Sequence, residues 1–374
     1  MWRPNVSFDP PTLNDVSDWA NERIRAGIST GQNIAQNTID DVRGIFDATS
    51  TCLTAIDNAR LDLSHRAIEY SNRIVQESLE PLREWIARFG VRWPRRDPRM
   101  RLFLIDSNGD RRYLFGEGDR DWTWREIRAD EVGNQKLVLL IHGLNTDPTA
   151  RDAYSYWDGI VKAIRPLRAH LTDPDYAFVV VSWDSEIRTS DLRLFGTLLT
   201  QAGSLALVQV GMMLGFDEFV RRARIVGGQI APILSNRNLP TLLCTHSLGA
   251  ECASYAIHQV ANTLTDTQWI DFQPAVPQNA WDENTGRYRR VGESFANGNP
   301  NSNRHVVVHS ELDIVLSLLY NTAVLNVPAG LYGSSRNNTD FDNVSVVNDV
   351  RESHGPDHYF DSIDVSSFVR SPFD

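Results

Sequence analysis

The segment that most constrains the fold is a short turn, centred on Ser247, between an apolar strand and a helix. The apolar run Leu242–Cys244 is typical of a buried strand, and residues 250–260 have the composition of a helix. The turn between them, Thr245–Gly249, places the serine between small residues. A sharp turn of this kind lifts a hydroxyl clear of a sheet, and small neighbours allow the tight approach. Thr245 stands where glycine is usual.

Further apolar runs predict the sheet to which this strand belongs. Lys136–Ile141 is continuously apolar after its first residue, which is typical of a parallel strand buried on both faces. It leads into His-Gly-Leu-Asn at 142–145. Other strands are expected at 177–184, 304–309 and 343–347. Together they predict an α/β fold with a mostly parallel central sheet flanked by helices.

These motifs resemble the α/β-hydrolase superfamily, on its lipase and serine-esterase branch, over roughly residues 130–374. The resemblance implies a nucleophile, an acid and a base in the chain order Ser, Asp, His. It assigns the first two to Ser247 and Asp313, the acid that follows the 304–309 strand. It also implies that the backbone N–H groups of Leu144 and Leu248 form an oxyanion hole. The next candidates for the acid are Glu311 and Asp349.

Two histidines near the C-terminus are candidates for the base. His354 lies in the loop after the last expected strand, whereas His358 directly precedes Tyr359 and Phe360, where a closing helix is expected. We favour His354, because a position within the loop gives the imidazole freer reach to the serine. His358 stays open as the alternative.

The residue types suit acyl transfer. A serine hydroxyl is a weak nucleophile until a neutral imidazole accepts its proton, and a carboxylate fixes the tautomer of that imidazole. The resemblance therefore implies a serine hydrolase that cleaves small-molecule or lipid-like carboxylic esters without a metal or an organic cofactor. A thioesterase, acyltransferase or peptidase on the same fold is an alternative. So is a non-catalytic interaction protein in which Ser247 only caps a helix.

Composition limits the partners and the compartment. The 374 residues carry a net charge of −11 and lack a basic footprint, so no nucleic-acid partner is expected. Cys52, Cys244 and Cys252 imply no disulfide framework, and the last two suit a core. The first residues lack the apolar centre of a signal peptide, so we expect a cytoplasmic protein, with signal-independent export left open. Membrane association is not indicated, and the oligomeric state is undetermined.

We expect two parts, an amphipathic helical segment over residues 1–98 and the hydrolase domain over 99–374. Apolar residues at helical spacing predict two or three helices in the first part, packed on protein rather than on a membrane. The domain is expected to open with a hairpin over Arg101–Phe115, since Asn108-Gly109 is a strong turn signal. That hairpin would form the antiparallel edge of the sheet.

Two insertions are expected to shape the site. The first is lid-like, spans about 184–238, and contains an apolar stretch over 198–216 that is interrupted by polar residues. We expect that stretch to form a buried or lid helix rather than a membrane span. The second spans about 274–303 and is rich in Asn, Gly and Pro, as expected of a loop over the site or of surface decoration.

Overall fold

The computed structural model describes most of the chain beyond residue 94. The described residues are 95–106, 110–115, 122–144, 173–185, 205–235, 237–282, 284, 286–296, 303–313, 315–320, 324, 326–335, 341–350, 354, 365–371 and 373. Apart from the first turns of one helix, they belong to one compact unit formed by residues 92–187 and 213–374. The N-terminal helical segment lies outside the described residues except for 95–98, so its helices stay a prediction.

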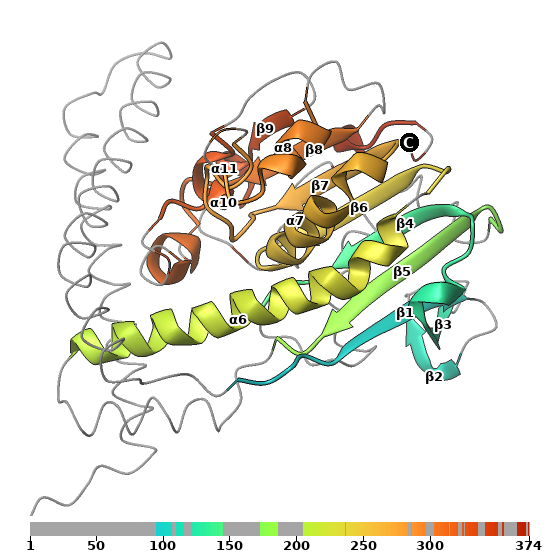
Figure 1. The fold of residues 1–374 in the computed structure, drawn as a ribbon, viewed down its shortest axis with the longest axis horizontal. Coiled ribbons are helices and arrows are strands. Elements are labelled where there is room, and N and C mark those ends of the chain that lie inside the picture. Colours follow the sequence, from blue (N-terminus) through green and yellow to red (C-terminus); the bar gives the residue numbers. More distant parts are fainter. Residues whose placement is uncertain are drawn as a thin grey trace, which may run out of the picture. The chain divides into compact units, whose positions relative to one another are not determined.

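A nine-stranded sheet forms the centre of this unit (Figure 1). Six neighbouring strands run parallel, in the spatial order β5-β4-β6-β7-β8-β9. They are β4 (Lys136–Ile141), β5 (Tyr176–Trp183), β6 (Thr241–His246), β7 (Thr267–Phe272), β8 (Arg304–His309) and β9 (Phe341–Ser345). Every residue of β5, β6 and β7 is buried, as expected for parallel strands covered on both faces. The α/β class and the mostly parallel sheet are confirmed.

Three antiparallel strands complete one edge of the sheet. They are β1 (Met100–Asp106), β2 (Asp110–Phe115) and β3 (Trp122–Ile127). The predicted pairing of β1 with β2 is wrong, because β3 lies between them. The reason is that both edges of β1 are already occupied, by β3 on one side and by β5 on the other. The turn signal at Asn108-Gly109 does not decide which strand the next one pairs with.

Helices cover the sheet on both faces. The helices α6 (Leu205–Leu234), α7 (Gly249–Val260) and α8 (Arg289–Ser294) contribute to one core. The opposite core includes residues of α11 (Val347–Val350) and of the C-terminal segment with η4 (Val365–Phe368). Leu139 and Leu140, adjacent on β4, belong to different cores because successive side chains alternate across a strand. The short elements are η1 (Ala129–Glu131), η2 (Ala261–Thr263), the π-helical η3 (Leu316–Tyr320) and α10 (Ala329–Tyr332).

The C-terminal half of α6 is a core helix. Phe219, Ala223, Val226 and Ile230 are buried in the same core as α7. A Cβ added at Gly227 would lie 2.4 Å from the carbonyl oxygen of Cys252, so the two helices pack closely at this glycine. The apolar residues in this half of the first insertion therefore serve packing. Residues 186–204 lie outside the described part, and a lid there stays a prediction.

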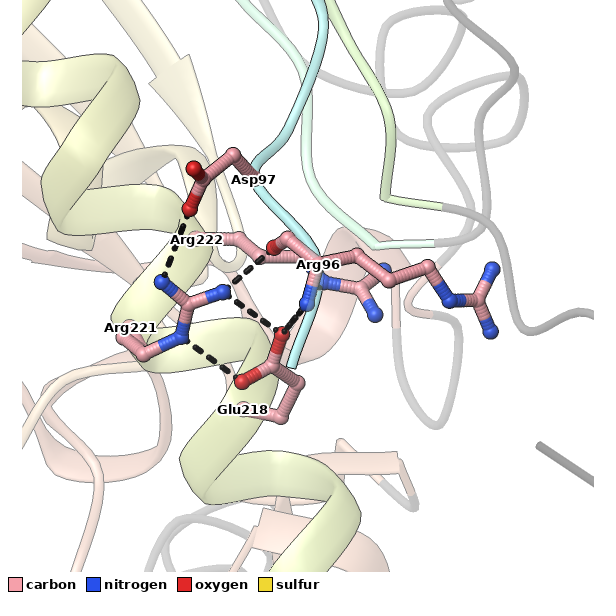
Figure 2. A network of polar contacts seen from close by, with 5 residues as sticks. All are labelled: Arg96, Asp97, Glu218, Arg221 and Arg222. Carbon is pink, nitrogen blue, oxygen red and sulfur yellow. Dashed lines mark hydrogen bonds and ion pairs between the residues drawn. The ribbon is translucent and has the colours of Figure 1, made fainter. Parts of the chain in front are cut away.

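A buried carboxylate fastens α6 to the segment that precedes β1 (Figure 2). Glu218 accepts hydrogen bonds from Nε of Arg221 at 2.7 Å, from Nε of Arg222 at 3.0 Å and from the backbone N–H of Arg96 at 3.0 Å. Arg221 also donates to Asp97 at 3.3 Å and to the carbonyl of Arg96. Burial acts to raise the pKa of Glu218, but these donors together lower it below its usual range. The carboxylate therefore stays ionised and holds the segment in place.

The second insertion also contributes to the core. Its aromatic side chains Trp281, Tyr288 and Phe295 are almost completely buried. Nε1 of Trp281 donates to Oγ of Ser254 on α7 at 2.9 Å. These three aromatic side chains therefore belong to the core that α7 shares and are not surface decoration. Among the described residues, no helix combines the length and the hydropathy that crossing a bilayer requires.

Candidate active site

The candidate site lies where the strand order of the parallel sheet reverses. From β4 the chain moves to β5 on one side and then returns to β6 on the other side. In open α/β sheets, ligands bind at such a switch point, in the crevice beyond the carboxyl ends of the strands. The two sequence motifs meet there, because the His142–Leu144 turn follows β4 and Ser247 follows β6.

Ser247 sits in a strained turn that its neighbours enforce. Its φ is 53°, in the left-handed region that non-glycine residues rarely adopt. Its N–H donates to the carbonyl of Phe272 at 2.9 Å, and its carbonyl accepts from the N–H of Ala275 at 3.0 Å. A Cβ added at Gly249 would lie 2.5 Å from the carbonyl oxygen of Ile141. Glycine is therefore required where α7 starts against β4, and the segment after β7 holds the serine on its other side.

Three predicted site residues form one hydrogen-bonded chain. Nε2 of His354 lies 2.9 Å from Oγ of Ser247, and Nδ1 of His354 lies 2.6 Å from Oδ2 of Asp313. The carboxylate is fully buried, and its other oxygen accepts the N–H of Leu316 at 2.9 Å. Because an ionised carboxylate only accepts, Nδ1 carries the proton and Nε2 is free to accept the serine proton. The arrangement can remove a proton from the hydroxyl and can stabilise the imidazolium that results.

The alternative acids lie elsewhere. Glu311 accepts from Oγ of Ser345 at 3.0 and 3.1 Å, and Asp349 is exposed on α11. Asp313 is the carboxylate bonded to His354, as the chain order predicts. His358 lies outside the described residues, so the alternative base is not tested by these contacts.

The turn after β4 is locked to β5 through His142. Nδ1 of this histidine donates to the carbonyl of Gly143 at 2.9 Å, and Nε2 accepts the backbone N–H of Trp183 at 3.1 Å. The indole N–H of Trp183 donates in turn to the carbonyl of His142 at 3.1 Å. Burial lowers the pKa of His142 to about 4, which keeps the ring neutral and able to accept. These bonds fix the backbone that leads to Leu144.

Both predicted oxyanion donors follow adjacent parallel strands. Leu144 is partly buried after β4, and the fully buried Leu248 is the N-cap of α7 directly after Ser247. Helix N-termini carry outward-pointing N–H groups and a partial positive charge that favour an anion. The roles of Leu144 and Leu248 as donors stay a prediction, and Asn145 lies outside the described residues.

One hydrogen-bond network near Ser247 was not anticipated from the sequence. Oγ1 of Thr245 donates to Oδ1 of Asp271 at 2.6 Å and accepts the indole N–H of Trp269 at 2.8 Å. This explains why a hydroxyl residue replaces glycine at position 245. Burial raises the pKa of Asp271 well above its usual range, which favours the neutral carboxyl. The available signal was an acid between two apolar residues, Ile270 and Phe272, in the segment that became β7.

The cysteines near the site are core residues, as predicted. Cys244 and Cys252 are fully buried and free, and burial raises the pKa of both thiols above the usual range. Neither thiol is therefore ionised near neutral pH. Among the residues that the structure describes, no group of three or more His, Cys, Asp or Glu side chains is placed to hold a metal ion.

Comparison with known proteins gives structural likenesses only. No family model matches the chain, and no curated protein sequence matches it. Among solved structures, the chain is similar to the enterobactin esterase FES from Shigella flexneri, in a crystal structure determined in the presence of 2,3-di-hydroxy-N-benzoyl-glycine. The two are 13% identical, the match covers 74% of this chain and 60% of that chain, and the TM-score is 0.29. A likeness this low carries no argument about activity or substrate.

Proposed function

We propose that this chain is a serine hydrolase of the α/β-hydrolase superfamily that cleaves carboxylic esters through an acyl-enzyme on Ser247. The observation that carries the proposal is the hydrogen-bonded chain from Oγ of Ser247 through His354 to Asp313. The location at the strand-order switch of a mostly parallel sheet, on a strained turn between β6 and α7, supports it further.

The proposed reaction follows from the hydrogen bonds that join these groups. Nε2 of His354 accepts the hydroxyl proton as Oγ of Ser247 attacks the ester carbonyl. Asp313 holds the other ring nitrogen and stabilises the imidazolium. The N–H groups of Leu144 and Leu248 would donate to the oxyanion of the tetrahedral intermediate, where one such donor is worth about 3 kcal/mol. The imidazolium then protonates the departing alkoxide, and water hydrolyses the acyl-enzyme by the same steps.

The proposed substrate class is small-molecule or lipid-like carboxylic esters. Phe219, Ala223 and Val226 of α6 are buried in the core, so these side chains do not line a substrate site. A thioesterase, an acyltransferase and a peptidase would use the same three side chains, so substrate assays must separate them.

A fluorophosphonate probe tests the proposal directly. Wild-type protein should be labelled on Ser247 and should hydrolyse short p-nitrophenyl esters. Ser247→Ala should melt at the wild-type temperature but lose labelling and turnover. Wild-type protein that melts cooperatively but is not labelled would instead support a non-catalytic protein that kept the fold.

A further inference from the structure

A second histidine packs directly against the proposed base. His246 is the last residue of β6, immediately before Ser247, and is 1% exposed. Its ring centroid lies 4.9 Å from that of His354, with the ring planes tilted by 48°. Residues 246 and 247 are adjacent, so one strand end places both the hydroxyl of Ser247 and the imidazole of His246 against the ring of His354.

The surroundings of His246 keep it neutral. Burial is the largest influence and lowers the pKa of His246 well below its usual range, and the neighbouring imidazoles of His354 and His142 act in the same direction. Hydrogen bonding to the backbone of His354 and to the side chain of Gln273 acts in the opposite direction without reversing the result. A neutral ring can face the imidazolium formed during catalysis without charge repulsion.

Gln273 is itself held firmly beside His246. It is fully buried, its φ is 44°, and its N–H donates to the carbonyl of Val308 at 2.8 Å. A Cβ added at Gly330 would lie 2.5 Å from the carbonyl carbon of Gln273, so α10 packs tightly on this backbone. The backbone of Gln273, the residue beside His246, is therefore held in place by its neighbours.

We propose that His246 is a positioning residue that holds the His354 ring in the plane required to bridge Ser247 and Asp313. The two hydrogen bonds of His354 act at the ring edge and leave the ring free to tilt about the axis that joins them. The buried ring of His246, packed against that of His354, restricts this tilt. The inference rests on the proposed function, because a positioned base matters only if Ser247 is acylated.

The effect on rate follows from geometry. A misplacement of about 1 Å in a reacting group costs about a hundredfold in rate. His246→Ala opens space behind His354 and should slow labelling of Ser247 by about tenfold to a hundredfold. The pH midpoint of labelling should also move from the wild-type value, since the contact of His354 with Asp313 changes. His246→Phe restores an aromatic face and should recover the rate to within about threefold.

His305 supplies the matched control. It is a fully buried histidine of the same sheet, stacked on Trp269 with ring centroids 3.8 Å apart. His305→Ala should lower the melting temperature at least as much as His246→Ala, yet label at the wild-type rate and with the wild-type pH midpoint. If His246→Ala does not fold, His246→Leu, which fills the volume without a flat ring, replaces it with the same expected result.

The decisive measurement is the second-order rate of fluorophosphonate labelling from pH 5 to pH 9, with melting temperatures alongside. A wild-type rate and midpoint in His246→Ala would overturn the inference and leave the proposed function intact. Equal losses of rate in His246→Ala and His305→Ala would also overturn it, because they would reflect general loosening of the core. Absence of labelling in the wild type would refute the proposed function itself.

Discussion

Two aspartate–histidine pairs lie among the described residues, and of these two only the pair that contains His354 is hydrogen-bonded to Ser247. Asp313 and His354 are joined at 2.6 Å, and the imidazole side chain is 13% exposed and bonded to Ser247. Asp271 and His305 are 3.7 Å apart, and both side chains are fully buried. Although 3.7 Å is within ion-pair range, burial raises the pKa of Asp271 and lowers that of His305, so burial favours the neutral form of both groups.

The difference comes from position along the strands. Asp271 lies within β7, in register with Thr245, and His305 lies within β8 under the ring of Trp269. Parallel strands are buried along their length, so a side chain there meets only core. The other pair follows the carboxyl ends of the strands, where a sheet opens to a crevice. The same two residue types are therefore structural in one place and suited to catalysis in the other.

The largest expected difference is between replacing His354 and replacing His305. His354→Ala should reduce acylation of Ser247 by about 10⁴-fold or more with little change in melting temperature. His305→Ala should acylate normally but lose about 3 kcal/mol of unfolding free energy, because a buried ring is removed. Single-turnover acylation and urea unfolding measure the two quantities. Loss of acylation in folded His305→Ala would break the contrast between the pairs.

The two aspartates should differ nearly as much. Asp313→Asn should lower the acylation rate by about 10⁴-fold, since an amide holds the wrong tautomer of His354. Asp271→Asn exchanges one neutral group for another of the same shape and keeps an acceptor for Thr245. Its rate should stay within about twofold of the wild type, as stopped-flow acylation would measure. A rate loss comparable to that of Asp313→Asn would mean that Asp271 is ionised and contributes to catalysis.

The buried histidines and Asp271 should also change how the free energy of unfolding depends on pH. Buried neutral histidines such as His142, with a folded-state pKa of about 4, bind fewer protons than in the unfolded state below pH 6.5. Stability is therefore lost as the pH falls, by about 2 kcal/mol per such group between pH 7.5 and pH 5. Asp271, whose pKa is raised, binds a proton in the folded state only, so its contribution grows as the pH falls.

Two variants separate these opposite contributions in urea titrations at pH 7.5 and pH 5. His305→Phe should reduce the loss of unfolding free energy between pH 7.5 and pH 5 by about 2 kcal/mol, because the variant lacks the histidine whose pKa burial lowers. Asp271→Asn should increase that loss. Parallel wild-type and variant profiles would contradict neutral burial of this pair.

The smallest expected effect concerns the hydroxyl of Thr245 on β6, which is hydrogen-bonded to Asp271 and Trp269. Thr245→Val leaves the indole N–H of Trp269 and Oδ1 of Asp271 without this hydroxyl, which should cost about 1 kcal/mol of stability. Thr245→Ser, which keeps the hydroxyl, is the control. Acylation of Ser247 should change by less than about threefold in both. A much larger loss confined to Thr245→Val would show that the buried network supports the chemistry.

Local sequence determined most of the sheet. The runs that became β4 and β8 were predicted with the observed bounds, and the run that became β6 was predicted to end two residues too early. Continuous apolar segments of strand length have few alternatives in a large α/β domain. The turn at Ser247 was also predictable from neighbouring residues, since a close junction between a strand and a helix needs a glycine such as Gly249. The order of Ser, Asp and His along the chain identified the candidate residues but not their contacts.

Tertiary structure decided what local patterns leave open. Neither the position of β3 between β1 and β2 nor the core role of the second half of α6 can be read from a single segment. The bonds of His354 join residues 41 and 107 positions apart in the chain, and the contact with His246 depends on the same long-range approach. Burial separates the two aspartate–histidine pairs, because the protonation of a carboxyl or an imidazole depends on the atoms packed around it rather than on its neighbours in sequence.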